Sequence, residues 1–142
     1  MTQPSIDARG PRFGAAITTV VLTVALLAGP GTLGTLLIGW QALAFALGAI
    51  VGLQAQPYGR VYAAFVRPRL SGPVPLEDPA PPRFAQSVGL GFAVVALIGA
   101  VAGQEALFTV AASFALAAAF LNAAFAFCLG CEMYLLIKRF SR

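Results

Sequence analysis

Two cysteines near the C-terminus have a spacing that is typical of thiol chemistry. Cys128 and Cys131 are the two cysteines of the chain, and two residues separate them. A Cys-x-x-Cys pair can cycle between dithiol and disulfide, and in a reducing compartment such a bond is transient, hence catalytic or sensory. The alternative is that two small sulfur side chains pack among alanines, since free cysteine is often buried. The spacing leaves these two interpretations evenly matched.

We expect both cysteines on one long helix that runs from Leu107 to Ile137 and is too long for the bilayer core. Glu132 is costly in lipid, so it places the membrane exit near Cys131. Helical positions three apart hold their Cβ atoms about 5–6 Å apart, whereas a disulfide needs about 3.5–4.5 Å. Gly130 is the residue at which the helix could unwind to close the bond. Glu132 also disfavours a reactive thiolate, and no strong activating group is visible.

A soft metal ion is an alternative partner for the same sulfur atoms. Cys128, Cys131 and Met133 could bind Cu(I), because thiolate and thioether ligands suit it. The chain has no histidine, which excludes imidazole catalysis and His-ligated metal sites. We expect no bound cofactor.

The composition is that of a membrane protein. Of the 142 residues, 59% are hydrophobic and 10% are charged, which is far more apolar than a soluble domain. Long stretches without charge predict an all-α membrane protein with four transmembrane helices, at residues 13–29, 33–53, 84–103 and 106–128. The first span follows basic residues as a signal peptide would, but it lacks a small-x-small cleavage site and we interpret it as retained. Residues 1–142 therefore form a single membrane domain.

The basic residues orient this domain. All nine Lys and Arg residues fall on one side of the four-span arrangement, and positive loops remain cytoplasmic. We therefore expect a multi-pass protein of the bacterial inner membrane with both termini in the cytoplasm. A net charge of +4 would suggest nucleic acid in a soluble protein. Here we attribute the charge to topology and lipid head groups, and expect no nucleic-acid partner.

A short internal sequence repeat divides the chain into two halves. Residues 7–13 recur as residues 78–84, with Asp, Pro, Arg and Phe at matching positions ahead of an apolar span. This sequence repeat predicts two parallel hairpin repeats, about residues 7–56 and 78–142, related by rotation about the membrane normal.

The loop between the repeats, residues 57–77, is expected to begin with a short amphipathic helix in the cytoplasmic interface. The apolar face of this helix holds Tyr58, Val61, Tyr62 and Phe65. The basic residues that face lipid head groups are Arg60, Arg67 and Arg69. Prolines from Pro68 onward predict an extended connector without regular structure.

Polar side chains inside the spans are few and uncharged, which argues against a proton or ion relay. Asn122 is the one of greatest interest, with an interhelical hydrogen bond favoured over contact with a substrate. Small residues at helical spacing, such as Gly48 with Gly52 and Gly99 with Gly103, favour a tight bundle and are also compatible with a homo-oligomer.

Four stretches carry a resemblance to a known family. Residues 9–13, 66–70, 76–86 and 121–134 resemble domain-of-unknown-function family 4395 (DUF4395), small integral membrane proteins frequent in actinobacteria. The resemblance covers essentially the whole chain, and its last two motifs are quite specific. It implies an integral membrane protein, and it implies thioredoxin-like or rhodanese-type sulfurtransferase proteins as partners.

The leading hypothesis is a membrane protein whose Cys128/Cys131 pair exchanges electrons or sulfur with a cytosolic thiol protein. The alternatives are a non-catalytic anchor or complex subunit that binds partners through its basic cytoplasmic face, and soft-metal handling by the cysteines. Whether the protein is an enzyme stays open at this point.

Overall fold

Four long helices dominate a computed structural model, which describes residues 5–141. They are α1 (Arg9–Ala28), α2 (Thr32–Ala46, continued by a π-helical segment, η1, Leu47–Val51), α4 (Ala80–Val101) and α5 (Glu105–Phe125). Each is long and apolar enough to cross a membrane. The prediction of a mainly helical protein with four helices long and apolar enough to span a membrane is confirmed.

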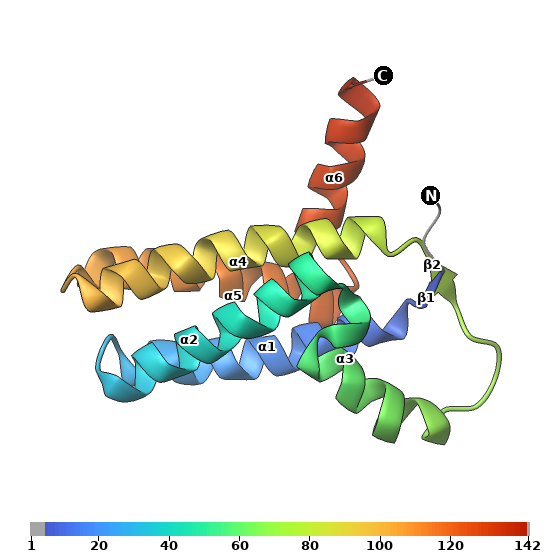
Figure 1. The fold of residues 1–142 in the computed structure, drawn as a ribbon, viewed down its shortest axis with the longest axis horizontal. Coiled ribbons are helices and arrows are strands. Elements are labelled where there is room, and N and C mark those ends of the chain that lie inside the picture. The colour runs from blue at the N-terminus through green and yellow to red at the C-terminus, as the bar shows by residue number, and fades with distance from the viewer. Residues whose placement is uncertain (1–4, 142) are drawn as a thin grey trace.

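The four spans form a bundle in which neighbours run antiparallel (Figure 1). Helix α1 packs against α2 and α5, and α4 packs against the same two helices. Short turns close the bundle at one end, where Gly29 (φ 78°) and Gly103 (φ 74°) adopt a backbone conformation that suits glycine. The opposite end carries the chain termini and the remaining elements (Figure 1).

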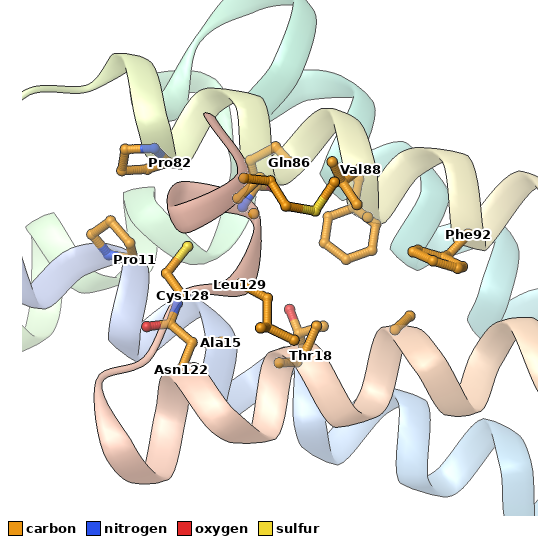
Figure 2. Close-up of a pocket in the computed structure, with 18 of the residues that line it drawn as sticks. Pro11, Ala15, Thr18, Pro82, Gln86, Val88, Phe92, Asn122, Cys128 and Leu129 are labelled. Carbon is orange, nitrogen blue, oxygen red and sulfur yellow. The ribbon is translucent and has the colours of Figure 1, made fainter. Parts of the chain in front are cut away.

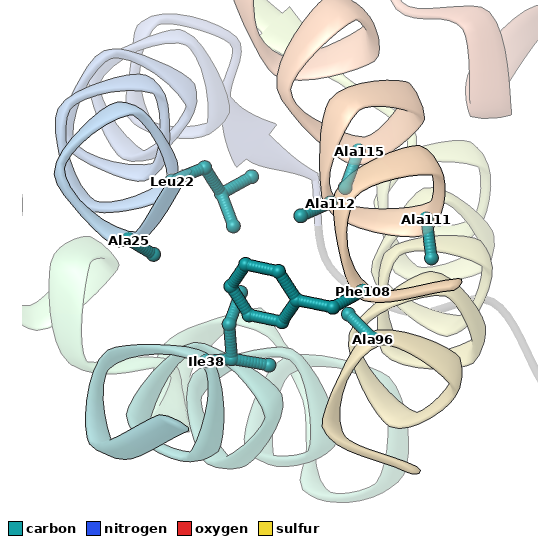
Figure 3. Packing of buried hydrophobic residues seen from close by; sticks show 8 residues of the cluster. All are labelled: Leu22, Ala25, Ile38, Ala96, Phe108, Ala111, Ala112 and Ala115. Carbon is teal, nitrogen blue, oxygen red and sulfur yellow. The ribbon is translucent and has the colours of Figure 1, made fainter. Parts of the chain in front are cut away.

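The packed core lies in the half of the bundle near these turns. Phe108 is fully buried among helices α1, α2 and α4, with Leu22 and Ile38 across from it (Figure 3). Alanines complete the cluster, as expected where helices in lipid associate through small residues. Gly99 serves the same purpose, because a Cβ atom there would lie 2.6 Å from the backbone nitrogen of Phe108.

The connector between α2 and α4 is more ordered than predicted. It contains η2 (Leu53–Ala55), α3 (Pro57–Val61), η3 (Tyr62–Val66), η4 (Arg67–Arg69) and strand β2 (Leu76–Glu77). Strand β2 pairs antiparallel with β1 (Ile6–Asp7), so the expectation of a connector without regular structure is wrong at this point. Backbone pairing with the N-terminal segment supplies hydrogen bonds that the connector's own sequence does not reveal.

We call α3 together with η3, residues 57–66, the α3 region. Its buried and exposed side chains differ from the predicted amphipathic face. Tyr58 and Tyr62 are buried against the bundle, whereas Val61 and Phe65 are exposed. The tyrosine hydroxyls are bonded: Tyr58 donates to Gln41 Oε1 at 2.8 Å and Tyr62 to Asp7 Oδ2 at 2.7 Å. Hydrogen-bond partners inside the protein therefore favour burial of the two tyrosines, while Val61 and Phe65 remain exposed.

A continuous helix from Leu107 to Ile137 was expected, and this expectation is wrong. Helix α5 ends at Phe125, and a separate helix, α6 (Leu129–Phe140), leaves the bundle at a steep angle (Figure 1). Ala126 adopts a left-handed conformation (φ 56°), and its N–H group donates to the carbonyls of Asn122 and Leu121. This hydrogen bonding ends α5, as in common helix C-caps.

Candidate functional site

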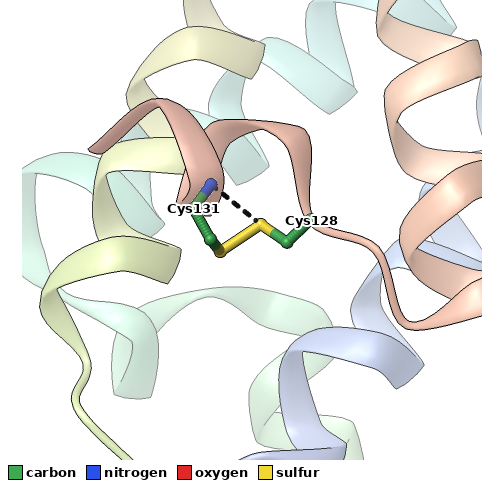
Figure 4. The surroundings of a disulfide bond; sticks show 2 residues. All are labelled: Cys128 and Cys131. Carbon is green, nitrogen blue, oxygen red and sulfur yellow. Dashed lines mark hydrogen bonds between the residues drawn. A yellow bond between two sulfur atoms is a disulfide. The ribbon is translucent and has the colours of Figure 1, made fainter. Parts of the chain in front are cut away.

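The two cysteines lie at the start of α6 and form a disulfide, with their Cα atoms 5.1 Å apart (Figure 4). Cys128 is the residue before the helix, with extended backbone (φ −90°, ψ 103°). Cys131 lies in the first turn, and its backbone N–H donates to Cys128 Sγ at 3.1 Å. The chain therefore meets the geometry of a disulfide by breaking the helix ahead of Cys128.

Gly130 has a different role from the unwinding suggested by the sequence. It is buried within α6, and a Cβ atom there would lie 2.6 Å from both Cα and Cβ of Ala85. Tyr134 packs against Phe84, with ring centroids 5.8 Å apart and ring planes tilted by 50°. These two contacts seat the first half of α6 on α4 and fix the position of the disulfide.

The N-terminus of α6, which the sequence did not reveal, begins directly after Cys128. Unpaired N–H groups and the helix dipole favour a negative charge at this end, so they stabilise the thiolate form of a reduced Cys128. The same dipole tolerates Glu132 in the first turn, and Lys138 and Arg139 in the last turn complement it. Only the division of α5 from α6 creates this environment.

Two arginines donate hydrogen bonds to helix C-termini at the end of the bundle that holds the disulfide. Arg12 donates to the Ala123 carbonyl near the end of α5 at 3.1 Å. Arg83 donates to the carbonyls of Ala49 and Ile50 in η1, at 3.2 and 2.9 Å. A cation at a helix C-terminus binds carbonyl groups that the helix leaves free.

A cavity of about 230 Å³ extends from the disulfide into the bundle. Figure 2 shows Cys128 near one end, beside Pro11 and Pro82, and Phe92 near the other. Its walls come from α1, α4, α5 and the first two turns of α6, with Phe45 from α2. The polar side chains on the wall are Thr18, Gln86 and Asn122. Among residues 5–141, none that line the cavity carries a charge.

Two predicted site residues line the cavity together with Cys128. Asn122, expected to bond between helices, lies on the wall together with Met133, the third sulfur of the proposed metal site. Gln86 lies on the wall as well, and its Oε1 atom is buried without a hydrogen-bond partner among the described residues. The predicted lipid-facing arginines Arg60, Arg67 and Arg69 are all exposed at the same end of the bundle.

A chain of buried hydrogen bonds links the α3 region to the spans. The Gln41 amide, fully buried in α2, donates to Thr18 Oγ1 at 3.2 Å and accepts from Tyr58. Trp40 Nε1 donates to the same Tyr58 hydroxyl at 2.9 Å. Burial raises the pKa of Tyr58, against the opposing effect of the Trp40 hydrogen bond, so its hydroxyl stays a donor. The sequence showed Thr18 and Gln41 only as polar residues within spans.

A second cluster, centred on Asp7, lies beside a cavity of about 260 Å³. Arg9 pairs with the carboxylate through Nε and Nη2 at 3.0 and 2.9 Å, and Tyr62 donates to it. These hydrogen bonds, of which the one from the Arg9 side chain has the largest effect, hold the pKa of Asp7 well below its usual range despite burial. Burial and the neighbouring carboxylate raise the pKa of Tyr62. Gln86 lines this cavity as well as the first.

Comparison with known proteins assigns the chain to a family. A family model described as "Domain of unknown function (DUF4395)" matches residues 6–139, nearly the whole chain. No curated protein and no solved structure matches it. The matched segment includes the Cys-x-x-Cys pair, all four spans and the Asp7 cluster. As its motifs predicted, the chain belongs to family DUF4395.

Proposed function

We propose that the protein is a thiol–disulfide exchange protein of the bacterial inner membrane, with Cys128 and Cys131 as its redox pair. One observation carries this proposal: a Cys-x-x-Cys disulfide lies at the N-terminus of a helix, at the end of a membrane bundle. Packing alone would not require the pair to begin a helix that leaves the bundle. In this position a disulfide can open and close without disturbing the spans.

The exchange begins at Cys131. A partner thiolate attacks Cys131 Sγ, a mixed disulfide forms, and Cys128 leaves as a thiolate that the α6 N-terminus stabilises. The partner's second thiol then attacks the mixed disulfide and releases Cys131. The partner loses two electrons and two protons, and Cys128 and Cys131 become the dithiol.

The partner is a cytosolic protein of thioredoxin-like or rhodanese type. Orientation supports a cytosolic partner, because the basic residues of the described chain gather at the end of the bundle that holds the disulfide. Basic segments resist translocation, so this end and both termini face the cytoplasm. A rhodanese-type partner would pass sulfane sulfur to the same thiols.

Two parallel repeats, each with two spans, underlie this architecture. Matching contacts support them: Arg12 binds the end of α5 as Arg83 binds η1, and α1 packs on α5 as α4 packs on α2. Phe13 lies 5.7 Å from Tyr62, and Phe84 lies 5.8 Å from Tyr134. In this scheme the α3 region is an interfacial helix and α6 is its counterpart, modified to carry the cysteines.

Trapping in cells tests the proposed exchange. Cys128→Ser leaves Cys131 to attack an oxidised partner and removes the sulfur of this chain that could release that partner. After acid quenching the mixed disulfide should therefore be captured with a thioredoxin-like or rhodanese-type protein, identified by mass spectrometry. Cys131→Ser is the matched control, and it should capture at least tenfold less because Cys128 faces the cavity. If neither variant captures a thiol protein and the double serine variant keeps full biological activity, the proposal is wrong.

An anchoring role is the second candidate, and the basic face favours it. Arg60 and Arg69 are exposed in and beside the α3 region, and Lys138 and Arg139 end α6. Such a face binds anionic lipid or an acidic partner. Full activity of the double serine variant would favour this alternative.

A further inference from the structure

We propose that the cavity beside Cys128 binds the ring of a lipid quinone, which accepts the electrons of the Cys128/Cys131 dithiol. The proposal rests on the thiol-exchange function above and names the oxidant that this function requires. Each turnover that reduces the disulfide needs an acceptor that restores it. The cavity shows which chemical class that acceptor belongs to.

The position of the cavity selects a reactant dissolved in the membrane. It lies between the spans and ends at Cys128 (Figure 2). Three of its wall residues also form the outer surface: Phe114, Leu129 and Met133 are 59%, 38% and 45% exposed. In a bilayer the α5 surface around Phe114 contacts lipid, so a ligand can enter from the acyl chains while its tail stays there.

The lining selects a neutral aromatic ring. No described wall residue is charged, which disfavours ionic ligands because an unpaired ion is costly in such a site. Phe92 and Phe114 stack with centroids 5.9 Å apart and offer flat apolar surface. A cavity of about 150 Å³ lined by apolar side chains can bind benzene, so about 230 Å³ accommodates a substituted ring.

The polar wall residues match the two edges of a quinone. A quinone has two carbonyl acceptors, and its reduced form has two hydroxyl donors. The Asn122 amide and the Thr18 hydroxyl can donate to the carbonyls. The buried Gln86 oxygen has no partner among the described residues and can accept from the reduced ring once its amide turns toward the cavity. Such groups orient a ring in a mainly apolar site.

The electron transfer balances through Cys128. Its thiolate adds to a ring carbon, so a carbon–sulfur bond forms and the ring takes up a proton. Cys131 thiolate then attacks Cys128 Sγ, the disulfide forms, and the carbon–sulfur bond breaks. The ring leaves with the electron pair and a second proton as the hydroquinone. Electrons run from dithiol to quinone, the direction in which membrane quinones drive disulfide formation elsewhere.

The test uses the full chain in lipid nanodiscs, reduced with dithiothreitol, desalted and kept anaerobic. Ubiquinone-1 is added, and quinone absorbance and free thiols are followed together. We expect one quinone reduced for each pair of thiols lost, and no disulfide formation in either single serine variant. Thiols that stay reduced in the wild type would overturn the proposal. Captured partners in the trapping experiment would then leave the exchange function standing.

A filled cavity separates the site from unspecific thiol–quinone chemistry. Ala119 lines the cavity, and Ala119→Leu should slow quinone reduction at least tenfold while dithiothreitol still reduces the disulfide at the wild-type rate. Ala117→Leu is the matched control, because Ala117 is an exposed residue of the same helix, and it should keep the wild-type rate. Equal rates in the wild type and both variants would place the reaction outside the cavity and overturn the proposal.

Discussion

At the scale of single residues, the surroundings of the cysteines and of Asp7 depend on their neighbours in the fold and not on sequence spacing alone. Cys128 and Cys131 were predicted as a pair, and they are joined in the structure. The stabilising helix N-terminus could not be predicted, because it exists only where the helix restarts at Leu129. Asp7 could likewise be recognised as part of a repeated motif. The hydrogen bond that it accepts from the Tyr62 hydroxyl could not, because it depends on the packing of the α3 region against the N-terminal segment.

The Asp7 cluster makes a prediction about acid stability. The pKa of Asp7 is lowered from its usual 3.8, so its contribution is full above that value and is lost as pH falls toward the folded-state pKa. Asp7→Asn should lower the free energy of unfolding by about 1–3 kcal/mol at neutral pH, since it removes charge-assisted hydrogen bonds. Thermal unfolding in detergent should show this loss, and the difference from wild type should shrink below about pH 4.

Glu77 changes the size of this difference and not its sign. Burial, followed by repulsion from Asp7 and Asp78, raises the pKa of Glu77, and Asp7→Asn removes the repulsion from Asp7. This relief offsets a part of the loss at neutral pH. Tyr62→Phe is the control that removes one bond to the carboxylate and keeps Arg9 in place. It should show a smaller loss with the same pH trend. An Asp7→Asn protein as stable as wild type at neutral pH would contradict the assignment.

At the scale of elements, hydropathy sufficed to find the four spans because each must be apolar along its whole length. The break between α5 and α6 was invisible, since Ala126 and Phe127 are neither glycine nor proline and carry no signal for a helix end. The pairing of β1 with β2 was missed for a similar reason: two residues are too few for a pattern. Both features depend on tertiary contacts.

The helix break at Ala126 can be tested by substitution. A left-handed conformation is unfavourable for alanine and suits glycine, so Ala126→Gly should stabilise the protein by about 0.5–1 kcal/mol. Ala117→Gly, in the middle of α5, should instead destabilise it by about 1 kcal/mol. The measurement is thermal unfolding of both variants in the same detergent. Loss of stability in both would indicate that the helix continues through residue 126.

At the scale of the whole molecule, the two halves of the bundle differ in how tightly they are packed. The half near the turns is filled by Phe108 and its neighbours, whereas the half near the termini encloses the cavity and the disulfide. A packed half can hold the spans together while the other half keeps space for a ligand. The spans of this arrangement could be predicted from hydropathy. The cavity could not be predicted, because a cavity depends on which side chains leave space between them in the folded bundle.

The orientation of the whole molecule in the membrane can be tested with reporter fusions. If the basic end is cytoplasmic, fluorescent reporters fused after residue 142 or within residues 71–75 should fold and fluoresce. Alkaline phosphatase fused at Pro30 or Gln104 should be active, because these turns lie at the opposite end of the bundle. A membrane-impermeant thiol reagent should label reduced Cys131 in inverted vesicles and not in intact cells. A cytoplasmic result at Gln104 would remove the four-span arrangement. Inverted results at every site would keep the bundle and move the disulfide, with its cavity, to the outer face, where its thiol partner would be extracytoplasmic.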